Sequence, residues 1–129
     1  MESMNYEKKP LNMIKKKQCT IEVIQANIRP VQDALDVLYG RWRLPILMSL
    51  AYGNKRFTQI SKEVKGISDK VLAKELKELE LNQLINRTIH ETFPPTVEYS
   101  ITKHGESLEN VMRELKYWGE SHRRKIIGK

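Results

Sequence analysis

The stretch that most constrains this chain is FTQISKEVKGISDKVLAKELKELELNQL, residues 57–84, which has the pattern of two short helices joined by a glycine turn. Thr58 is suited to cap the first helix, and Gly66 offers the left-handed backbone conformation that commonly ends a helix. Ser68 is suited to cap the second helix, which contains no glycine or proline as far as Leu81. The pattern therefore predicts a helix-turn-helix.

The second helix of this pair has two different faces. At about 100° per residue, three lysines fall within an arc of roughly 60°, and three leucines lie roughly opposite them. The lysines are Lys70, Lys74 and Lys77, and the leucines are Leu72, Leu76 and Leu79. One face therefore suits a hydrophobic core and the other suits a partner. A solvated lysine face is the alternative, because the helix as a whole carries more acidic than basic residues.

The length and charge of the chain allow one small basic domain. Its 129 residues can bury a modest core. The formal net charge is +7, and it is concentrated at the ends, since residues 1–18 carry five lysines against two glutamates and residues 113–129 carry six Lys or Arg against two glutamates. Basic ends favour a polyanion through counterion release, but they serve solubility equally well and specify no sequence.

Apolar runs and cysteines indicate where such a chain would work. No apolar run approaches the ~18 residues of a transmembrane helix, and the lysine-rich start lacks the apolar segment of a signal peptide. The single cysteine, Cys19, excludes an intrachain disulfide and a cysteine-based zinc site. We therefore expect a cytoplasmic protein without membrane contact.

The first third of the chain predicts a tail followed by a helix. Residues 1–18 read as a flexible basic tail, and residues 19–129 as a single domain. Residues 19–28 are ambiguous between strand and helix. Pro30 suits the first turn of a helix that ends at Gly40. The apolar stripe of this helix consists of Val31, Ala34, Leu35 and Leu38.

The next helix is expected to begin near Arg41 or Trp42 and to stop at Gly53. Trp42 is expected to anchor the core, because stacking on a base is the rarer use of a tryptophan in a compact domain. Lys55 and Arg56 follow this helix and could contact phosphate from the start of the helix-turn-helix. Solvated charge is the alternative for both.

Two segments after the helix-turn-helix alternate apolar and polar residues with a period of two. They are INRTIHE, residues 85–91, and TVEYSI, residues 96–101. Thr92-Phe93-Pro94-Pro95 separates them, and because prolines cannot donate to a sheet ladder, they belong at a hairpin tip or edge. A hairpin over residues 85–101 directly after a helix-turn-helix predicts a wing.

A final helix is predicted over residues 103–121, with Thr102 as its cap. Its apolar residues repeat at intervals of three and four, and they are Leu108, Val111, Met112, Leu115 and Trp118. Because three helices already cover the core of a small winged domain, we expect this stripe to pack against a second copy of the chain. Folding back on its own chain is the alternative, and the end, residues 121–129, reads as a basic tail.

The sequence contains no arrangement typical of catalysis. His90, His104 and His122 lack metal-ligand spacing, and there is no nucleophile elbow, Walker loop or dinucleotide-binding glycine motif. We therefore expect no enzymatic activity, no metal and no cofactor. Cys19 lies near a lysine run that would favour its thiolate, but a lone cytoplasmic cysteine is usually inert.

Across roughly residues 29–119, the sequence resembles the HxlR-type family of bacterial winged helix-turn-helix regulators. The matching segments are ALDVLYGRW (34–42), KRFTQI (55–60), GISDKVLAKELKELE (66–80), PPTVEYSIT (94–102), Gly105 and Trp118-Gly119. The resemblance implies a mainly α (α+β) fold, a winged helix-turn-helix with a two-stranded wing and with dimerisation helices at both ends of the chain.

The resemblance also implies a function. The chain would be a homodimeric, sequence-specific transcription regulator that places a recognition helix, residues 68–81, in each major groove of an inverted repeat in double-stranded DNA. Residues 92–96 would reach the flanking minor groove. The implied DNA-binding residues are Arg56, Ser68, Lys70, Val71, Lys74, Lys77, Phe93, Pro94, Pro95 and Thr96. A winged helix used as a protein-interaction or structural dimer module is the alternative.

One position departs from the family pattern. Many members carry a cysteine directly before the proline of the first helix, and some of them sense oxidants through it, whereas this chain has Arg29 before Pro30. Cys19 lies ten residues upstream, outside the resemblance, so thiol sensing is not carried over to it. No small-molecule effector is indicated by any group of residues.

Overall fold

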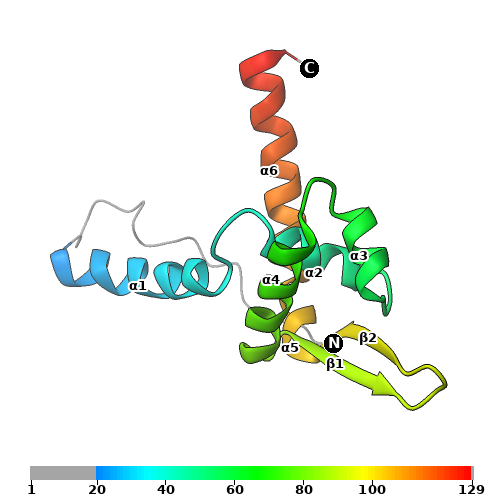
Figure 1. Cartoon of the computed structure of the whole chain (residues 1–129). Coiled ribbons are helices and arrows are strands. Elements are labelled where there is room, and N and C mark those ends of the chain that lie inside the picture. The colour runs from blue at the N-terminus through cyan, green and yellow to red at the C-terminus, as the bar shows by residue number, and fades with distance from the viewer. Residues whose placement is uncertain (1–19, 129) are drawn as a thin grey trace. The chain divides into compact units, whose positions relative to one another are not determined.

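A computed structural model describes residues 20–128 of the chain (Figure 1). The predicted tail, residues 1–18, and Cys19 lie outside the described residues. The chain divides after Gly40 into two units, which we describe in turn.

The first unit contributes one helix, α1 (Ile21–Val37). Thr20 caps it, because the Thr20 hydroxyl accepts a hydrogen bond from the backbone N–H of Val23 at 3.2 Å. The ambiguous segment, residues 19–28, is therefore helical where it is described, and Pro30 lies inside the helix. The predicted start of the helix at Pro30 was wrong, because the polar cap at Thr20 starts it ten residues earlier.

The second unit begins with three helices, α2 (Arg43–Ala51), α3 (Phe57–Glu63) and α4 (Asp69–Leu81). The helix-turn-helix predicted over residues 57–84 is confirmed, and Gly66 has a positive φ of 90° in its turn. The predicted Thr58 cap was wrong. Arg56 precedes α3, and its backbone N–H is satisfied by the side-chain oxygen of Gln59 at 2.8 Å.

The predicted wing is confirmed as a two-stranded antiparallel hairpin, β1 (Ile85–His90) and β2 (Thr96–Ile101). Ile85 pairs with Ile101, and Arg87 pairs with Tyr99. The backbone of Lys55 adds a bridge to the outer side of β2, since its N–H and C=O bond to Tyr99 at 2.9 and 2.8 Å. The hairpin is thereby tied to the start of the helix-turn-helix.

Apolar side chains from α2, α3, α4 and the hairpin form the core of this unit. The leucines predicted for the core face of α4 are buried, with exposed fractions of 0%, 2% and 0% for Leu72, Leu76 and Leu79. Trp42 is only partly buried, and the Arg41 guanidinium lies over its ring at 4.7 Å. The other fully buried side chains are Ile46, Leu47, Leu50, Ile60, Leu84 and Ile85.

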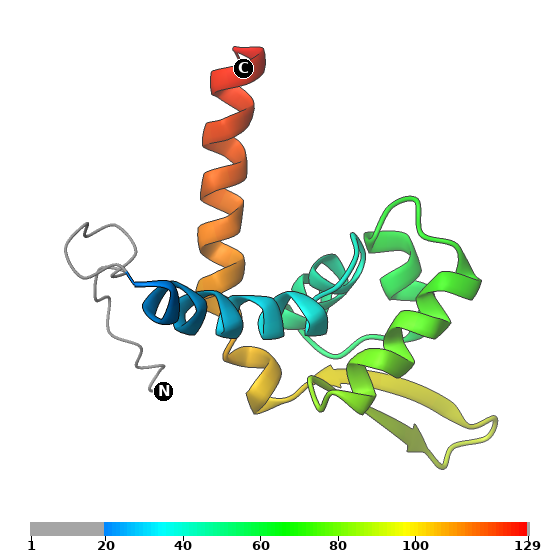
Figure 2. The ribbon, with the colours of Figure 1, turned by 90° about the vertical axis from the view of Figure 1, so that its left-hand side faces the viewer.

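The C-terminal segment forms two helices, α5 (Lys103–Glu106) and α6 (Glu109–Ile127). The helix predicted over residues 103–121 starts at Lys103 as predicted, but it is interrupted after Glu106, and its second part continues beyond the predicted end to Ile127. Thr102 caps only the short α5, by accepting from the N–H of Gly105 at 2.9 Å. The predicted basic tail is helical as far as Ile127. Figure 2 shows α6 leading away from the winged core.

Candidate nucleic-acid interface

The outer face of α4 carries the lysines predicted to meet a partner. Ser68 caps the helix as predicted, since its hydroxyl accepts from the N–H of Val71 at 3.2 Å. Lys70, Lys74 and Lys77 are exposed, and none of them forms an ion pair with another residue between 20 and 128. Their charges are therefore available to an anionic partner.

The inner side of α4 is fixed by an ion pair as well as by leucines. The Nε of Arg43 donates to a carboxylate oxygen of Glu75 at 2.6 Å, and the two side chains are only 10% and 12% exposed. This pair joins α2 to α4 and withdraws Glu75 from the lysine face. No periodicity could reveal the pair, because its members lie 32 residues apart.

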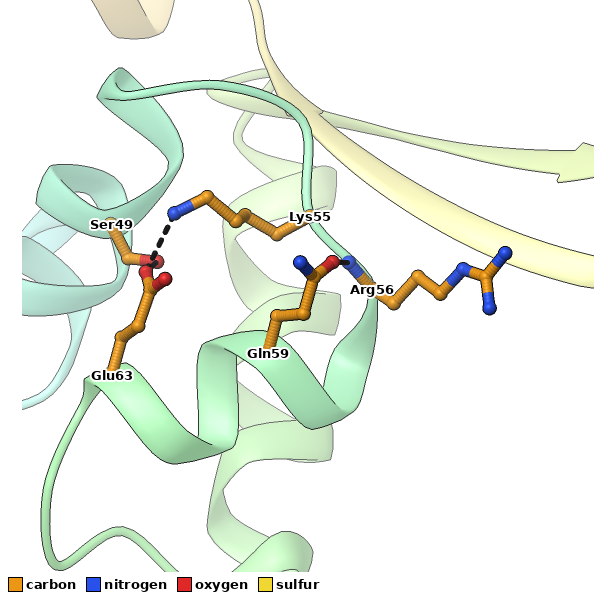
Figure 3. Close-up of polar contacts among 5 residues, drawn as sticks. All are labelled: Ser49, Lys55, Arg56, Gln59 and Glu63. Carbon is orange, nitrogen blue, oxygen red and sulfur yellow. Dashed lines mark hydrogen bonds and ion pairs between the residues drawn. The ribbon is translucent and has the colours of Figure 1, made fainter.

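A second polar cluster holds α3 against α2 and the preceding loop (Figure 3). The Glu63 carboxylate accepts from Lys55 Nζ at 2.6 Å and from Ser49 Oγ at 2.7 Å. The hydrogen bond from Lys55, and then that from Ser49, lowers the pKa of Glu63. Lys55 is only 13% exposed and already neutralises a carboxylate, so the structure does not present it to phosphate as the sequence suggested.

Arg56, the next residue, behaves differently from Lys55. Its backbone belongs to the start of α3, but its guanidinium extends away from the Glu63 cluster (Figure 3). The side chain is exposed and forms no ion pair within the described part of the chain. It can therefore reach an external phosphate.

The tip of the wing is apolar and exposed. Phe93 is fully exposed at 102%, and Pro94 and Pro95 beside it are exposed as well. The Thr92 hydroxyl donates to the Pro94 carbonyl at 2.7 Å, and the Thr92 N–H donates to the His90 carbonyl at 2.8 Å. The two bonds shape the tip locally, and the hairpin carries it away from α4 (Figure 1).

The predicted apolar stripe on α6 is only partly exposed to solvent. Val111, Leu115 and Trp118 are 39%, 49% and 64% exposed. Met112 is 7% exposed and belongs to the core of its own chain, and Leu108 is half-buried immediately before the helix. Three of the five predicted interface residues therefore present a substantial apolar surface.

Residues 20–128 contain no cluster of three or more His, Cys, Asp or Glu side chains that could hold a metal ion. None of their helices is both long enough and apolar enough to cross a membrane.

A core-anchored helix with an open lysine face, followed at once by a two-stranded hairpin, defines a winged helix-turn-helix protein. The family of HxlR-like helix-turn-helix proteins matches residues 37–126. The chain belongs to this family, and it is a DNA-binding transcriptional regulator of the helix-turn-helix class.

Individual relatives are similar over most of their length. The chain is 36% identical over 98 residues to YtcD, an HTH-type transcriptional regulator of Bacillus subtilis, covering 76% of this chain and 78% of YtcD. It is 35% identical over 91 residues to the Escherichia coli HTH-type regulator YtfH, covering 70% and 72% of the two proteins. These relatives are named as regulators of transcription rather than as enzymes.

Solved structures share the fold. The redox regulator HypR in its reduced form superposes with a TM-score of 0.72 at 34% identity, covering 78% of this chain and 99% of that one. A MarR-family transcriptional regulator from Enterococcus faecalis V583 gives a TM-score of 0.65 at 29% identity, covering 89% of this chain and all of the other. The winged helix-turn-helix fold class is thereby confirmed.

Proposed function

We propose that the chain acts as a homodimer that binds an inverted-repeat operator in double-stranded DNA. In each half-site, α4 would enter the major groove and residues 92–96 would approach the flanking minor groove. The observation that carries this proposal is the asymmetry of α4, whose leucines are buried while its three lysines are exposed and unpaired among the described residues. This activity would place the protein in the cytoplasm.

The beginning of α4 is the part suited to base recognition, because the N-terminal residues of a recognition helix contact base edges. Lysine can donate to the O6 and N7 acceptors of guanine, and a valine can pack on a thymine methyl group. Contacts to phosphate fix the position of the protein without specifying sequence. We assign base or phosphate contacts to Ser68, Lys70, Val71 and Lys74, and backbone contacts to Arg56 and Lys77.

Two exposed apolar faces support the homodimer. The first is the α6 face formed by Val111, Leu115 and Trp118. The second lies on α1, where apolar side chains 39–68% exposed recur at alternating intervals of three and four, the spacing of a helix–helix seam. These residues are Ile21, Ile24, Ile28, Val31 and Leu35. A second copy of the chain would cover such faces and supply the two-fold symmetry that an inverted repeat requires.

The proposal is tested by competition binding with the DNA upstream of the protein's own coding sequence. At physiological salt, we expect this DNA to outcompete random DNA of equal length, and we expect Lys70→Ala with Lys74→Ala to lower the affinity substantially. Lys62→Ala with Lys103→Ala removes the same charge from α3 and α5 and serves as the matched control. Equal binding of specific and random DNA, together with no effect of the α4 variant, would leave only a protein-interaction module.

A further inference from the structure

An open cavity of about 410 Å³ lies where the recognition helix meets the wing. We call it the helix–wing pocket. Helix α4 packs against β1 at this place, as both views show (Figures 1 and 2). Its lining residues come from α4, β1 and β2, and they are Ala73, Leu76, Lys77, Glu80, Arg87 and Tyr99.

Two cations from different elements share this pocket. Lys77 comes from α4, and Arg87 comes from β1. Neither forms an ion pair with any residue that the structure describes, and Glu80 is the one acidic side chain in the lining. Like charges that face one cavity repel each other, so a bound anion would stabilise both.

Arg87 lies on the face of the hairpin that begins at the core. It pairs with Tyr99, which is 9% exposed, and it lies two residues after Ile85, which is 1% exposed. Because side chains alternate along a strand, Arg87 is on the same face of the sheet as Ile85, the face that packs on the domain. Arg87 is exposed, and on this face it lines the helix–wing pocket.

The pocket lies between the two elements that would enter different grooves of DNA. If α4 occupies the major groove and the wing tip approaches the adjacent minor groove, the backbone of one strand must pass between them. We propose that Lys77 and Arg87 form a binding site for a phosphate oxyanion. A backbone phosphate of the DNA is one source of this oxyanion, and that source rests on the proposed function; a free phosphate compound is the other.

The chemistry of the lining matches phosphate. The planar guanidinium of Arg87 can donate two parallel hydrogen bonds to phosphate oxygens, and Lys77 adds a compact charge. Glu80 opposes both and weakens the site. Tyr99, which lines the pocket, is held in place by two backbone hydrogen bonds to Lys55, at 2.8 and 2.9 Å.

The first arm of the test measures the affinity of the full chain for specific and random DNA over a series of salt concentrations. Removing one phosphate contact with Arg87→Gln should weaken binding to both DNAs by a similar factor and reduce the slope of log K against log salt by about 0.9. Arg87→Lys should retain most of the slope. The control Lys103→Gln removes one charge from α5, outside the pocket, and should leave the slope unchanged.

Substitution of Glu80 should change the affinity for DNA in the opposite direction. Glu80→Gln removes the opposing carboxylate and should raise the affinity for both DNAs, whereas Glu106→Gln on α5 should change it little. An equal gain from both glutamine variants would show that net charge alone is responsible, and it would count against the site.

The second arm uses inorganic phosphate without DNA. Backbone amide chemical shifts of β1 and β2 are followed during titration with phosphate at constant ionic strength, for the wild type and for Arg87→Gln. Saturable shifts in the wild type that are lost in the variant assign the site to free phosphate compounds. A salt-slope effect without such shifts assigns it to the DNA backbone.

The inference is overturned if Arg87→Gln leaves the salt slope unchanged and phosphate produces no saturable shift. Specific DNA binding by the same wild-type protein would show that the proposed function survives this failure. If the wild type prefers no DNA sequence, the proposed function fails, and the phosphate titration still decides the inference.

Discussion

Helices α4 and α6 are both amphipathic, but the apolar side of α4 is buried, whereas that of α6 is largely exposed. The three leucines of α4 are at most 2% exposed, so the chain buries this side completely and leaves lysines outside. On α6, Met112 is buried, while Val111, Leu115 and Trp118 keep 39–64% of their surface exposed. The surface left over on α4 is cationic and suits a polyanion, whereas the surface left over on α6 is apolar and suits another protein.

The buried ion pair between Arg43 and Glu75, which joins α2 to α4, can be removed by substitution. Glu75→Ala removes the carboxylate that accepts a hydrogen bond from Arg43, whose side chain is only 10% exposed, and we expect a loss of about 3–5 kcal/mol in the free energy of unfolding. Chemical denaturation measures this loss. Arg43→Met with Glu75→Leu should recover most of it, because a well-packed apolar pair of similar volume replaces the ion pair.

A nearby carboxylate provides the control for this prediction. Glu78→Ala changes a residue of the same helix that forms no ion pair within residues 20–128, and it should cost less than about 0.5 kcal/mol. Equal losses from Glu75→Ala and Glu78→Ala would contradict the role assigned to the ion pair.

A charge introduced on the apolar side of α6 should disrupt the dimer rather than the fold of the chain. Leu115→Glu places a charge at a residue that is 49% exposed, so we expect the chain to stay folded and to sediment as a monomer. Tyr117→Glu is the matched control, because Tyr117 is 52% exposed but lies away from the stripe, and it should remain dimeric. A Leu115→Glu protein that is still a dimer would exclude this face as the main interface.

The Glu63 cluster predicts a smaller, pH-dependent effect. Hydrogen bonds from Lys55 and Ser49 hold the pKa of Glu63 below its ordinary value in the folded state, so the stabilisation is present above that ordinary value and is lost as the pH falls through the folded pKa. Glu63→Gln should therefore be less stable than the wild type at pH 7, and the difference should shrink on acidification. Denaturation at pH 7 and below pH 4 measures it, and a difference that does not depend on pH would refute the prediction.

The smallest expected effect concerns the single cysteine. Proteins of similar structure include the redox regulator HypR, and the only cysteine in the sequence of this chain is Cys19. We expect Cys19→Ser to leave both the operator affinity and its response to oxidants unchanged. Loss of an oxidant response that the wild type shows would assign a sensing role to Cys19.

Local sequence signals predicted the elements of this fold but not all of their ends. The Ser68 cap and the core leucines of α4 depend on neighbouring residues, and the structure confirms them. At Pro30 and Thr58, a suitable residue type was present, but Thr20 and the Arg56–Gln59 bond start the helices instead. Competing caps a few residues apart cannot be ranked by residue type alone.

Long-range contacts account for what the sequence could not predict in the site. Glu63 neutralises Lys55 across eight residues, and Arg43 binds Glu75 across 32. Arg87 reaches the helix–wing pocket only because the hairpin folds onto α4. Such partners depend on tertiary packing, which periodicity does not encode.

The central claim is that two copies of the lysine face of α4 read DNA together. Selection of bound sequences from a random double-stranded library tests it most directly. We expect the wild type to enrich an inverted repeat whose half-site centres are about 10–10.5 base pairs apart, or a multiple of that distance. Recovery of no common sequence, or of a single unrepeated half-site, would contradict the account.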